Sequence, residues 1–140
     1  MRYLLICLVA LTLFSCKEAE VTEFQYTTVT MMGKTIMKVS QEKVTVDFSG
    51  RGEPTHFERE TKDTEWIALM SSLKDVDLDK VNGLEAPSNK RATDAAPFAS
   101  FSFVTPDSTY KSASFDHKNP NEMLMPLMQE FLKVQEENKN

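Results

Sequence analysis

The stretch EFQYTTVTMMGKTIMKVSQEKVTVDF, residues 23–48, decides the fold of this chain. Apolar and polar side chains alternate along much of it, and β-branched and aromatic residues are frequent, which is the pattern of half-buried β-strands. Gly33 marks one turn directly after Met31-Met32, and the polar run 41–43 marks another. Because both connections are short, the three strands that they join are expected to pair as antiparallel hairpins.

A weaker strand and then a helix are expected next. Residues 56–60 favour a fourth strand, placed at an edge of the sheet because charged side chains are frequent in it. Trp66, Leu69, Met70 and Leu73 recur at helical spacing, which predicts one apolar stripe packed against the sheet. We expect this helix to begin near residue 62, with a neighbouring threonine or aspartate as its cap.

A long connection and a second hairpin follow the helix. Residues 85–97 show no hydrophobic period and are bracketed by prolines, which predicts a loop longer than compact domains usually need. Phe101 and Phe103 alternate with serines, and Pro106-Asp107 marks a turn. Residues 110–115 are therefore expected to return as the second strand of the hairpin.

The last element is expected to be a helix whose apolar stripe lies between residues 124 and 134. Asn119 has the position of an N-cap, with Pro120 as the first helical residue. Pro126 interrupts this pattern and leaves two alternatives open. Either it kinks the helix, or the main helix begins there and residues 120–125 form a preceding turn.

The element order ββββ-α-ββ-α predicts an α+β fold. We expect an antiparallel sheet of about five to six strands with two helices packed on one face, so that the other face stays open. The single domain is expected to span residues 23–136, with a frayed polar tail at residues 137–140. A parallel α/β fold is disfavoured because the early strands follow one another through short turns.

The N-terminal residues predict where in the cell the protein is located. A cation at Arg2 precedes an apolar run of about twelve residues, whereas a bilayer core about 30 Å thick needs a helix of about 20. Such a run is typical of a cleavable secretory signal. Leu13, Ser15 and Cys16 at its end resemble the lipobox of bacterial lipoproteins, in which the cysteine receives a diacylglycerol and becomes the new N-terminus.

This resemblance implies a signal peptide at residues 1–15, a lipidated Cys16 and a polar tether at residues 16–22. It places the protein in the bacterial cell envelope, anchored to a membrane through the lipid on Cys16, with the outer membrane expected and the face left open. Lys17 and the acidic residues after it resemble a surface-display signal of some outer-membrane lipoproteins; the alternative is a flexible tether. Without lipidation, residues 1–15 would be an ordinary secretory signal.

Composition limits the chemistry of the mature domain. The two cysteines, Cys7 and Cys16, both lie at the leader, so the mature domain is expected to have no disulfide and no cysteine nucleophile. The formal net charge of −5 argues against nucleic acid as a partner. No cofactor or metal is expected: the acidic run 75–79 has Lys80 where a calcium loop needs glycine, and the chain has only two histidines.

Four residues are candidates for binding: Arg91 and Asp94 in the long loop, and Asp116 and His117 before the last helix. A cation and an acid at this spacing can form a polar recognition site together with His117. The alternative is structural, an Arg91–Asp94 or Arg91–Asp116 pair that orders the loop. A hydrolase triad of Ser114 with Asp116 and His117 is disfavoured, because adjacent strand residues point to opposite faces.

These observations favour a non-catalytic, lipid-anchored envelope protein over an enzyme. We expect it to bind an envelope or extracellular protein, or a small ligand, through the open sheet face and the long loop. One alternative is an inhibitor of an extracellular hydrolase, and another is a small enzyme that uses His117 with Asp116 or Asp94.

Overall fold

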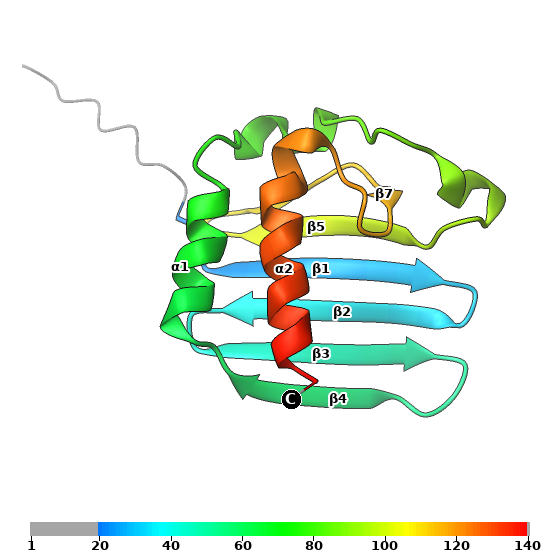
Figure 1. The fold of residues 1–140 in the computed structure, drawn as a ribbon, viewed down its shortest axis with the longest axis horizontal. Helices are drawn as coiled ribbons and strands as arrows, with labels where there is room; N and C mark the ends of the chain where they lie inside the picture. Colours follow the sequence, from blue (N-terminus) through cyan, green and yellow to red (C-terminus); the bar gives the residue numbers. More distant parts are fainter. Residues whose placement is uncertain (1–19, 140) are drawn as a thin grey trace, which may run out of the picture.

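The computed structural model describes residues 20–139 of the chain and shows an α+β fold, an antiparallel sheet with two main helices (Figure 1). The expected fold class is therefore confirmed. The expected signal peptide, Cys16 and the first part of the expected tether lie outside the described residues. None of the helices within residues 20–139 is long and apolar enough to cross a membrane.

Seven strands of this part of the chain form one sheet in the order β4-β3-β2-β1-β5-β6, and β7 pairs with β5 beside β6. All of the pairs are antiparallel. The strands are β1 Glu23–Thr30, β2 Gly33–Ser40, β3 Lys43–Gly50, β4 Thr55–Glu60, β5 Phe98–Val104, β6 Thr109–Lys111 and β7 Phe115–Asp116.

The pairing register of the central strands β1, β2 and β5 explains why the alternation of apolar and polar residues decides the fold. Tyr26 of β1 lies opposite Met37 of β2 on one side and Phe101 of β5 on the other. Opposite residues of antiparallel strands point to the same face, so the apolar side chains of the three strands gather on one side of the sheet. That side is the core face.

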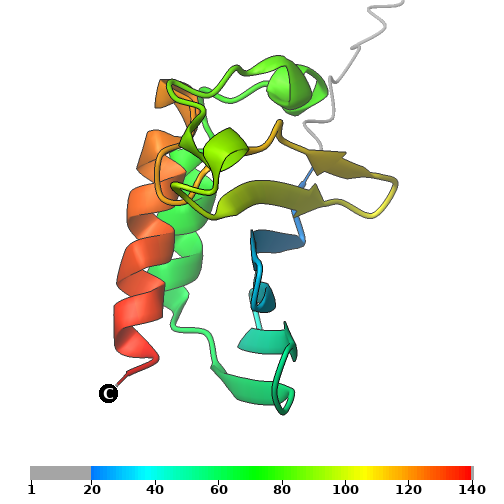
Figure 2. The ribbon, with the colours of Figure 1, turned by 90° about the vertical axis from the view of Figure 1, so that its right-hand side faces the viewer.

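Two helices cover the core face. Helices α1 (Asp63–Ser72) and α2 (Met125–Glu137) lie side by side (Figure 1), and the edge-on view in Figure 2 shows both on the same side of the sheet. The 3-10 helices η1 (Leu78–Gly83), η2 (Lys90–Thr93) and η3 (Glu122–Leu124) lie in the connections. The buried apolar side chains are Val21, Phe24, Tyr26, Met37, Val39, Val44, Leu69, Val81, Ala99, Phe101, Phe103, Phe115, Leu124, Leu127, Met128, Phe131 and Val134.

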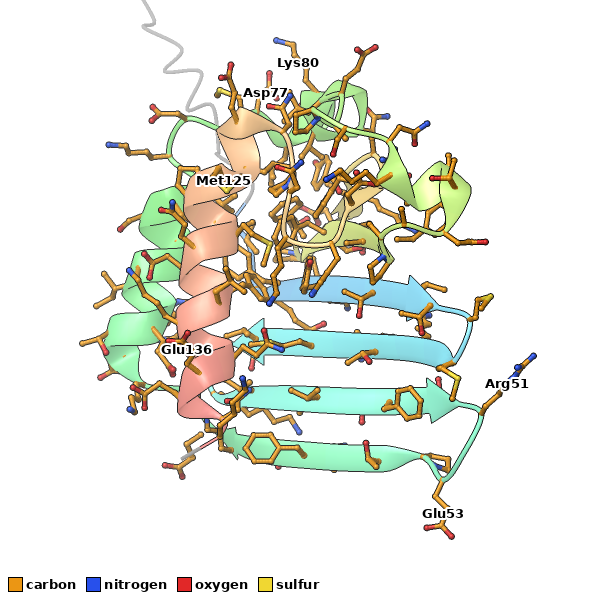
Figure 3. The ribbon with its side chains drawn as sticks, turned by 45° about the vertical axis from the view of Figure 1, so that its right-hand side comes forward. Arg51, Glu53, Asp77, Lys80, Met125 and Glu136 are labelled. Carbon is orange, nitrogen blue, oxygen red and sulfur yellow. The ribbon has the colours of Figure 1, made fainter. Side chains whose placement is uncertain are left out.

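The opposite sheet face is open and mostly polar. Its central row runs from Thr27 through Ile36 and Asp47 to His56. The helices also leave part of the core face uncovered, because the β3–β4 turn with Arg51 and Glu53 projects well beyond them (Figure 3). The open face expected from the sequence is thus present, but it offers few apolar groups to a partner.

The return strand of the second hairpin is shorter than expected. In place of one strand over 110–115, β6 and β7 pair with different parts of β5, and residues 112–114 lie between them. Ser112 is the physical cause, because its hydroxyl accepts the Phe101 N–H at 3.0 Å and replaces a backbone acceptor of the ladder. The backbone is then free to turn before β7.

The helix starts also differ from the expectation. Asn119 does not cap the last helix; Asn121 does so for η3, since its side chain accepts the Met123 N–H at 3.0 Å. The main helix α2 then begins at Met125 with Pro126 in its first turn, which settles the alternative left open by the sequence. In α1 the N-cap is Lys62.

The ordered domain is slightly longer than the expected residues 23–136. Val21 of the expected tether is buried in the core. Glu137 closes α2 and pairs with Lys62 at 2.5 Å, and Asn138 accepts a hydrogen bond from Arg59 at 2.6 Å. Residues 137 and 138 thus contact β4 and the N-cap residue of α1.

Candidate functional site

Asp116 is the centre of a polar cluster that fixes the long loop 85–97. Its side chain is 3% exposed at the end of β7. One carboxylate oxygen accepts the Ser88 hydroxyl at 2.5 Å and the Lys90 N–H at 2.9 Å. The other accepts the Arg91 N–H at 2.9 Å. We call Asp116, Ser88, Lys90 and Arg91 the Asp116 cluster.

Arg91 closes this cluster with its guanidinium group. Nη1 donates to the Asp116 carboxylate at 3.2 Å and to the Ser88 carbonyl at 2.8 Å, and Nε donates to the Ser114 hydroxyl at 3.3 Å. Of the two pairings that the sequence left open, the structure therefore contains Arg91–Asp116. Asp94 lies apart: it is exposed, has a left-handed backbone at φ 56°, and its side chain makes no hydrogen bond within residues 20–139.

The electrostatics of the cluster favour a charged Asp116. Burial acts to raise the pKa of this carboxyl, but hydrogen bonds from Ser88, from the backbone of Arg91 and Lys90, and from the guanidinium outweigh it. The pKa of Asp116 is held well below its usual range. Because the folded-state pKa is lowered, the cluster contributes stability above the unfolded pKa of about 4 and loses it only in strong acid.

Two asparagines from the α2 side complete the attachment of the loop. The Asn119 amide donates to the Ser88 hydroxyl oxygen at 2.9 Å. The Asn121 amide donates to the Glu85 carbonyl at 2.8 Å. A loop without regular hydrogen-bond ladders is thereby joined at several points to the segment between β7 and α2.

The fixed loop borders a shallow depression of about 640 Å3, the 85–91 depression. Its lining is mostly small and polar. Nη2 of Arg91 makes no hydrogen bond within the described part of the chain, so this side of the guanidinium remains available as a donor. The lining residues are Glu85, Ala86, Pro87, Ser88, Asn89, Arg91, Ala113 and Ser114.

His117 takes part in a different contact. Its Nδ1 lies 2.8 Å from the hydroxyl of buried Tyr26, and the two rings stack. Because the Tyr26 oxygen already accepts the Lys118 N–H at 3.2 Å, we infer that the phenol donates to Nδ1 of a neutral ring. Burial raises the pKa of Tyr26 to about 12, against a smaller opposing effect of the Lys118 hydrogen bond.

The four candidate residues thus divide into three sets. Arg91 and Asp116 are in contact, His117 follows in the next turn but bonds to Tyr26, and Asp94 belongs to neither contact. Sequence reasoning missed Ser88 and Asn121; it considered Ser114 only for a hydrolase triad and Asn119 only as a helix cap. The only available signal was the polar composition of the turn that follows Pro87, which does not indicate a contact with β7.

The acidic run 75–79 forms a helix start. Asp77 accepts the Asp79 N–H at 3.1 Å as the N-cap of η1, and it pairs with Lys80 at 2.9 Å (Figure 3). Among the described residues no group of three or more histidine, cysteine or acidic side chains is placed to hold a metal ion.

Asp116→Asn is expected to loosen the loop while the sheet stays intact. The substitution keeps the size of the side chain, but it removes the charge that Arg91 and two backbone N–H groups contact. Hydrogen exchange should show faster exchange at the amides of Lys90 and Arg91. Asp94→Asn is the matched control and should leave both amides as they are. Unchanged protection in Asp116→Asn would contradict the role given to the carboxylate.

His117 should make the domain less stable in mild acid. Burial lowers the pKa of its imidazole, and the nearby Lys118 charge adds to this. The unfolded chain therefore binds a proton more readily, so that stability falls as pH drops through about 6.5. The urea midpoint should decrease more between pH 7.5 and pH 5.5 in the unchanged protein than in His117→Gln. Equal decreases of the urea midpoint in the two proteins would show that the His117 ring has the same pKa in the folded and the unfolded state.

No known protein family matches this chain, and no curated protein is similar enough in sequence to count as a relative. Its function has to be inferred from the geometry and chemistry of the chain itself.

Proposed function

We propose that this protein is a non-catalytic binding module of the bacterial envelope, anchored through a lipid on Cys16, and that it recognises its ligand at the 85–91 depression. The observation that carries the proposal is the Asp116 cluster, in which a buried carboxylate holds the loop bordering the depression. A long loop fixed on a rigid sheet is a frequent position for a binding site.

Preorganisation is the physical argument. An irregular loop that orders only on binding loses conformational entropy at that moment, which weakens affinity. Here the hydrogen bonds to Asp116 and those from Asn119 and Asn121 order the loop during folding, so its conformational entropy is already lost before a ligand binds. A ligand at the depression then gains its contacts without having to order the loop.

The donors at the depression indicate the chemistry of the ligand. The free side of the Arg91 guanidinium and the exposed Ser114 hydroxyl can both donate to a carbonyl or a carboxylate. The depression is shallow and open, which suits an extended segment of a protein better than a fully enclosed small molecule. An envelope or extracellular protein that presents such a segment is therefore the proposed partner.

The state of the acidic and basic groups supports binding over catalysis. Asp116 already accepts hydrogen bonds on both carboxylate oxygens, and its lowered pKa makes it a weak base. His117 is engaged with Tyr26 through Nδ1, and its side chain is not hydrogen-bonded to Asp116 in the described part of the chain. The pair therefore lacks the contact by which a carboxylate orients a catalytic histidine.

Photocrosslinking in intact cells tests the proposed site. A photoreactive residue at Ser114 or at Asn89, both exposed at the depression, should give a defined adduct with a partner. The same residue at Ile67, exposed on α1, is the matched control and should not give that adduct. Adding Asp116→Asn to the Ser114 variant should reduce the adduct. Identical adducts at all three positions, or none at Ser114 and Asn89, would contradict the site.

Mass spectrometry of the protein from the membrane fraction tests the anchor separately. The expected N-terminal peptide begins at Cys16 and carries a diacylglycerol on its sulfur. Cys16→Ala should release the protein from the membrane fraction. A mature chain that starts elsewhere with a free thiol would refute the anchor, while the crosslinking result would still decide the binding site.

Inhibition of an extracellular hydrolase remains a second proposal. The observation in its favour is that the exposed loop is held in one conformation, as an inhibitory loop must be to resist rearrangement in an active site. The full chain should then inhibit at least one enzyme of a panel of proteases and lysozymes, and Asp116→Asn should weaken that inhibition. No inhibition across the panel would reject this alternative.

A further inference from the structure

The two edges of the sheet differ in how well they are protected. At one edge β6 has only three residues, and β7 beside it has two. At the other edge β4 extends over six residues without a proline, and Figure 2 shows no element beyond it. Exposed edges pair readily with other strands, and natural proteins usually shorten, bend, cover or charge them; β4 is charged, but it is neither short nor covered. The β4 edge is therefore available for pairing with another strand.

The hydrogen-bond pattern shows which backbone groups of β4 are available. The Thr61 N–H donates to the Glu42 carbonyl at 3.1 Å, which continues the β3–β4 ladder beyond Glu60. Because backbone groups alternate in direction along a strand, odd-numbered residues of β4 bond to β3. The N–H and C=O groups of His56 and Glu58 then point away from the sheet, as do those of Glu60, whose carbonyl accepts a hydrogen bond from Arg59 Nη1 at 2.9 Å.

We infer that β4 pairs antiparallel with β4 of a second copy of this chain, about a two-fold axis that passes through Phe57. In this register His56 of each copy lies opposite Glu58 of the other, and the two exchange backbone hydrogen bonds. The two sheets become one continuous sheet, with the helices of both copies on the same side. The inference does not depend on the binding function proposed above.

Charge favours this register over the one with the two-fold axis at Glu58. With the axis at Phe57, the His56 imidazole of each copy faces the Glu58 carboxylate of the other copy. With the axis at Glu58, two glutamates would face each other directly, and like charges in opposite positions destabilise a pair. Within each copy Asp47 lies 2.6 Å from His56 and Lys43 lies 2.9 Å from Glu58, so acidic and basic groups alternate across the proposed pair.

The exposure of Phe57 supports the same register. This side chain is 38% exposed on the core face of the edge strand, beyond Val46 of β3. In the proposed pair the two Phe57 rings are direct neighbours, and aromatic cross-strand pairs stabilise antiparallel sheets. An apolar side chain that the monomer leaves in water is thereby buried.

Cysteine crosslinking of the full chain in its own envelope tests the register. In a facing pair without backbone hydrogen bonds the Cα atoms lie about 4.5 Å apart, within the disulfide range. Phe57→Cys should therefore give a disulfide-linked dimer on a non-reducing gel, several-fold above the unchanged chain. Ile67→Cys, at an exposed site on α1, is the control for random collisions.

The neighbouring positions distinguish this register from loose association. His56→Cys alone should not crosslink, because the two Cα atoms would be about 8–9 Å apart, beyond the disulfide limit of about 7 Å. His56→Cys co-expressed with a differently tagged Glu58→Cys chain should give a mixed dimer. Crosslinking of Phe57→Cys no greater than that of Ile67→Cys would overturn the inference, as would equal crosslinking of His56→Cys alone.

Charge exchange provides a second readout in the Phe57→Cys chain. His56→Glu places acids opposite each other and should lower the crosslinked fraction several-fold. Adding Glu58→His again places a histidine opposite a glutamate and should recover the crosslinked fraction. His56→Glu also loses the 2.6 Å contact with Asp47 of its own chain, but both changes are at exposed positions of β4, so the melting temperature of the reduced protein should fall only slightly. No loss with His56→Glu, or no recovery with Glu58→His, would overturn the assigned register.

Discussion

Phe101→Ala is expected to lower the free energy of unfolding by about 3–5 kcal/mol. Phe101 is fully buried in β5 and is the centre of the aromatic core. Its ring centroid lies 5.0 Å from that of Tyr26, 5.3 Å from that of Phe131 and 5.5 Å from that of Phe115. The truncation removes these contacts and leaves a cavity between the sheet and α2, which a packed core fills only in part.

Phe98→Ala provides the matched control in the same strand. Phe98 is 44% exposed and lies on the open face, so its truncation should cost less than about 1 kcal/mol. Urea unfolding followed by tryptophan fluorescence from Trp66 measures both variants. Similar losses in the two variants would mean that the aromatic core does not carry the stability assigned to it.

Arg59→Leu is expected to cost about 3–5 kcal/mol of unfolding free energy, because it leaves a buried acid without its partner. The guanidinium contacts both carboxylate oxygens of Glu65, at 2.7 and 2.8 Å, and Nε donates to Asn138 at 2.6 Å. These contacts join β4 to α1 and to the end of α2. The side chains of Arg59 and Glu65 are only 18% and 10% exposed.

Two comparisons isolate the effect of the buried charge. Arg59→Leu combined with Glu65→Leu should lose less stability than Arg59→Leu alone, since no unpaired carboxylate remains. Lys43→Ala breaks an exposed pair with Glu58 and should cost less than about 1 kcal/mol. If Arg59→Leu were as mild as Lys43→Ala, the pair would not hold the edge strand to the helices.

The Arg59–Glu65 pair also makes the free energy of unfolding depend on pH. Burial acts to raise the pKa of Glu65, but the hydrogen bonds from Arg59 and the Lys62 backbone, together with the Arg59 charge, outweigh it and lower the pKa. A lowered folded-state pKa means that the contribution is present above about pH 4.5 and is lost as pH falls through the folded value. The stability gap between the unchanged protein and Arg59→Leu should narrow on acidification from pH 7 to pH 3.

Most of the sheet could be read from local pattern. Alternation along β1, β2 and β3 and the glycine and polar turns between them are properties of neighbouring residues, and the structure confirms the antiparallel order and the edge position of the fourth strand. The split of the last hairpin strand could not be read in this way. It depends on the Ser112 hydroxyl meeting the Phe101 N–H, a contact that exists only once β5 is in place.

The candidate site likewise depends on contacts that form only in the folded structure. The sequence predicted Arg91, Asp94, Asp116 and His117 as candidate binding residues, since basic and acidic side chains in or near a long loop often form ion pairs or bind ligands. It could not choose between Asp94 and Asp116 as the partner of Arg91. Proximity along the chain favours Asp94, yet the partner lies 25 positions away. The β5–β7 pairing brings it there.

The sequence by itself therefore determined the α+β class, the first four strands and the apolar stripes of the two main helices, because these follow from the periodicity of side chains on a regular backbone. Only the tertiary structure decided the Asp116 cluster, the Tyr26–His117 contact and which backbone groups of the β4 edge stay unpaired. Each of these joins groups that are distant in sequence or depends on which strand has no neighbour. Such relations are set by sheet register and by the packing of the core.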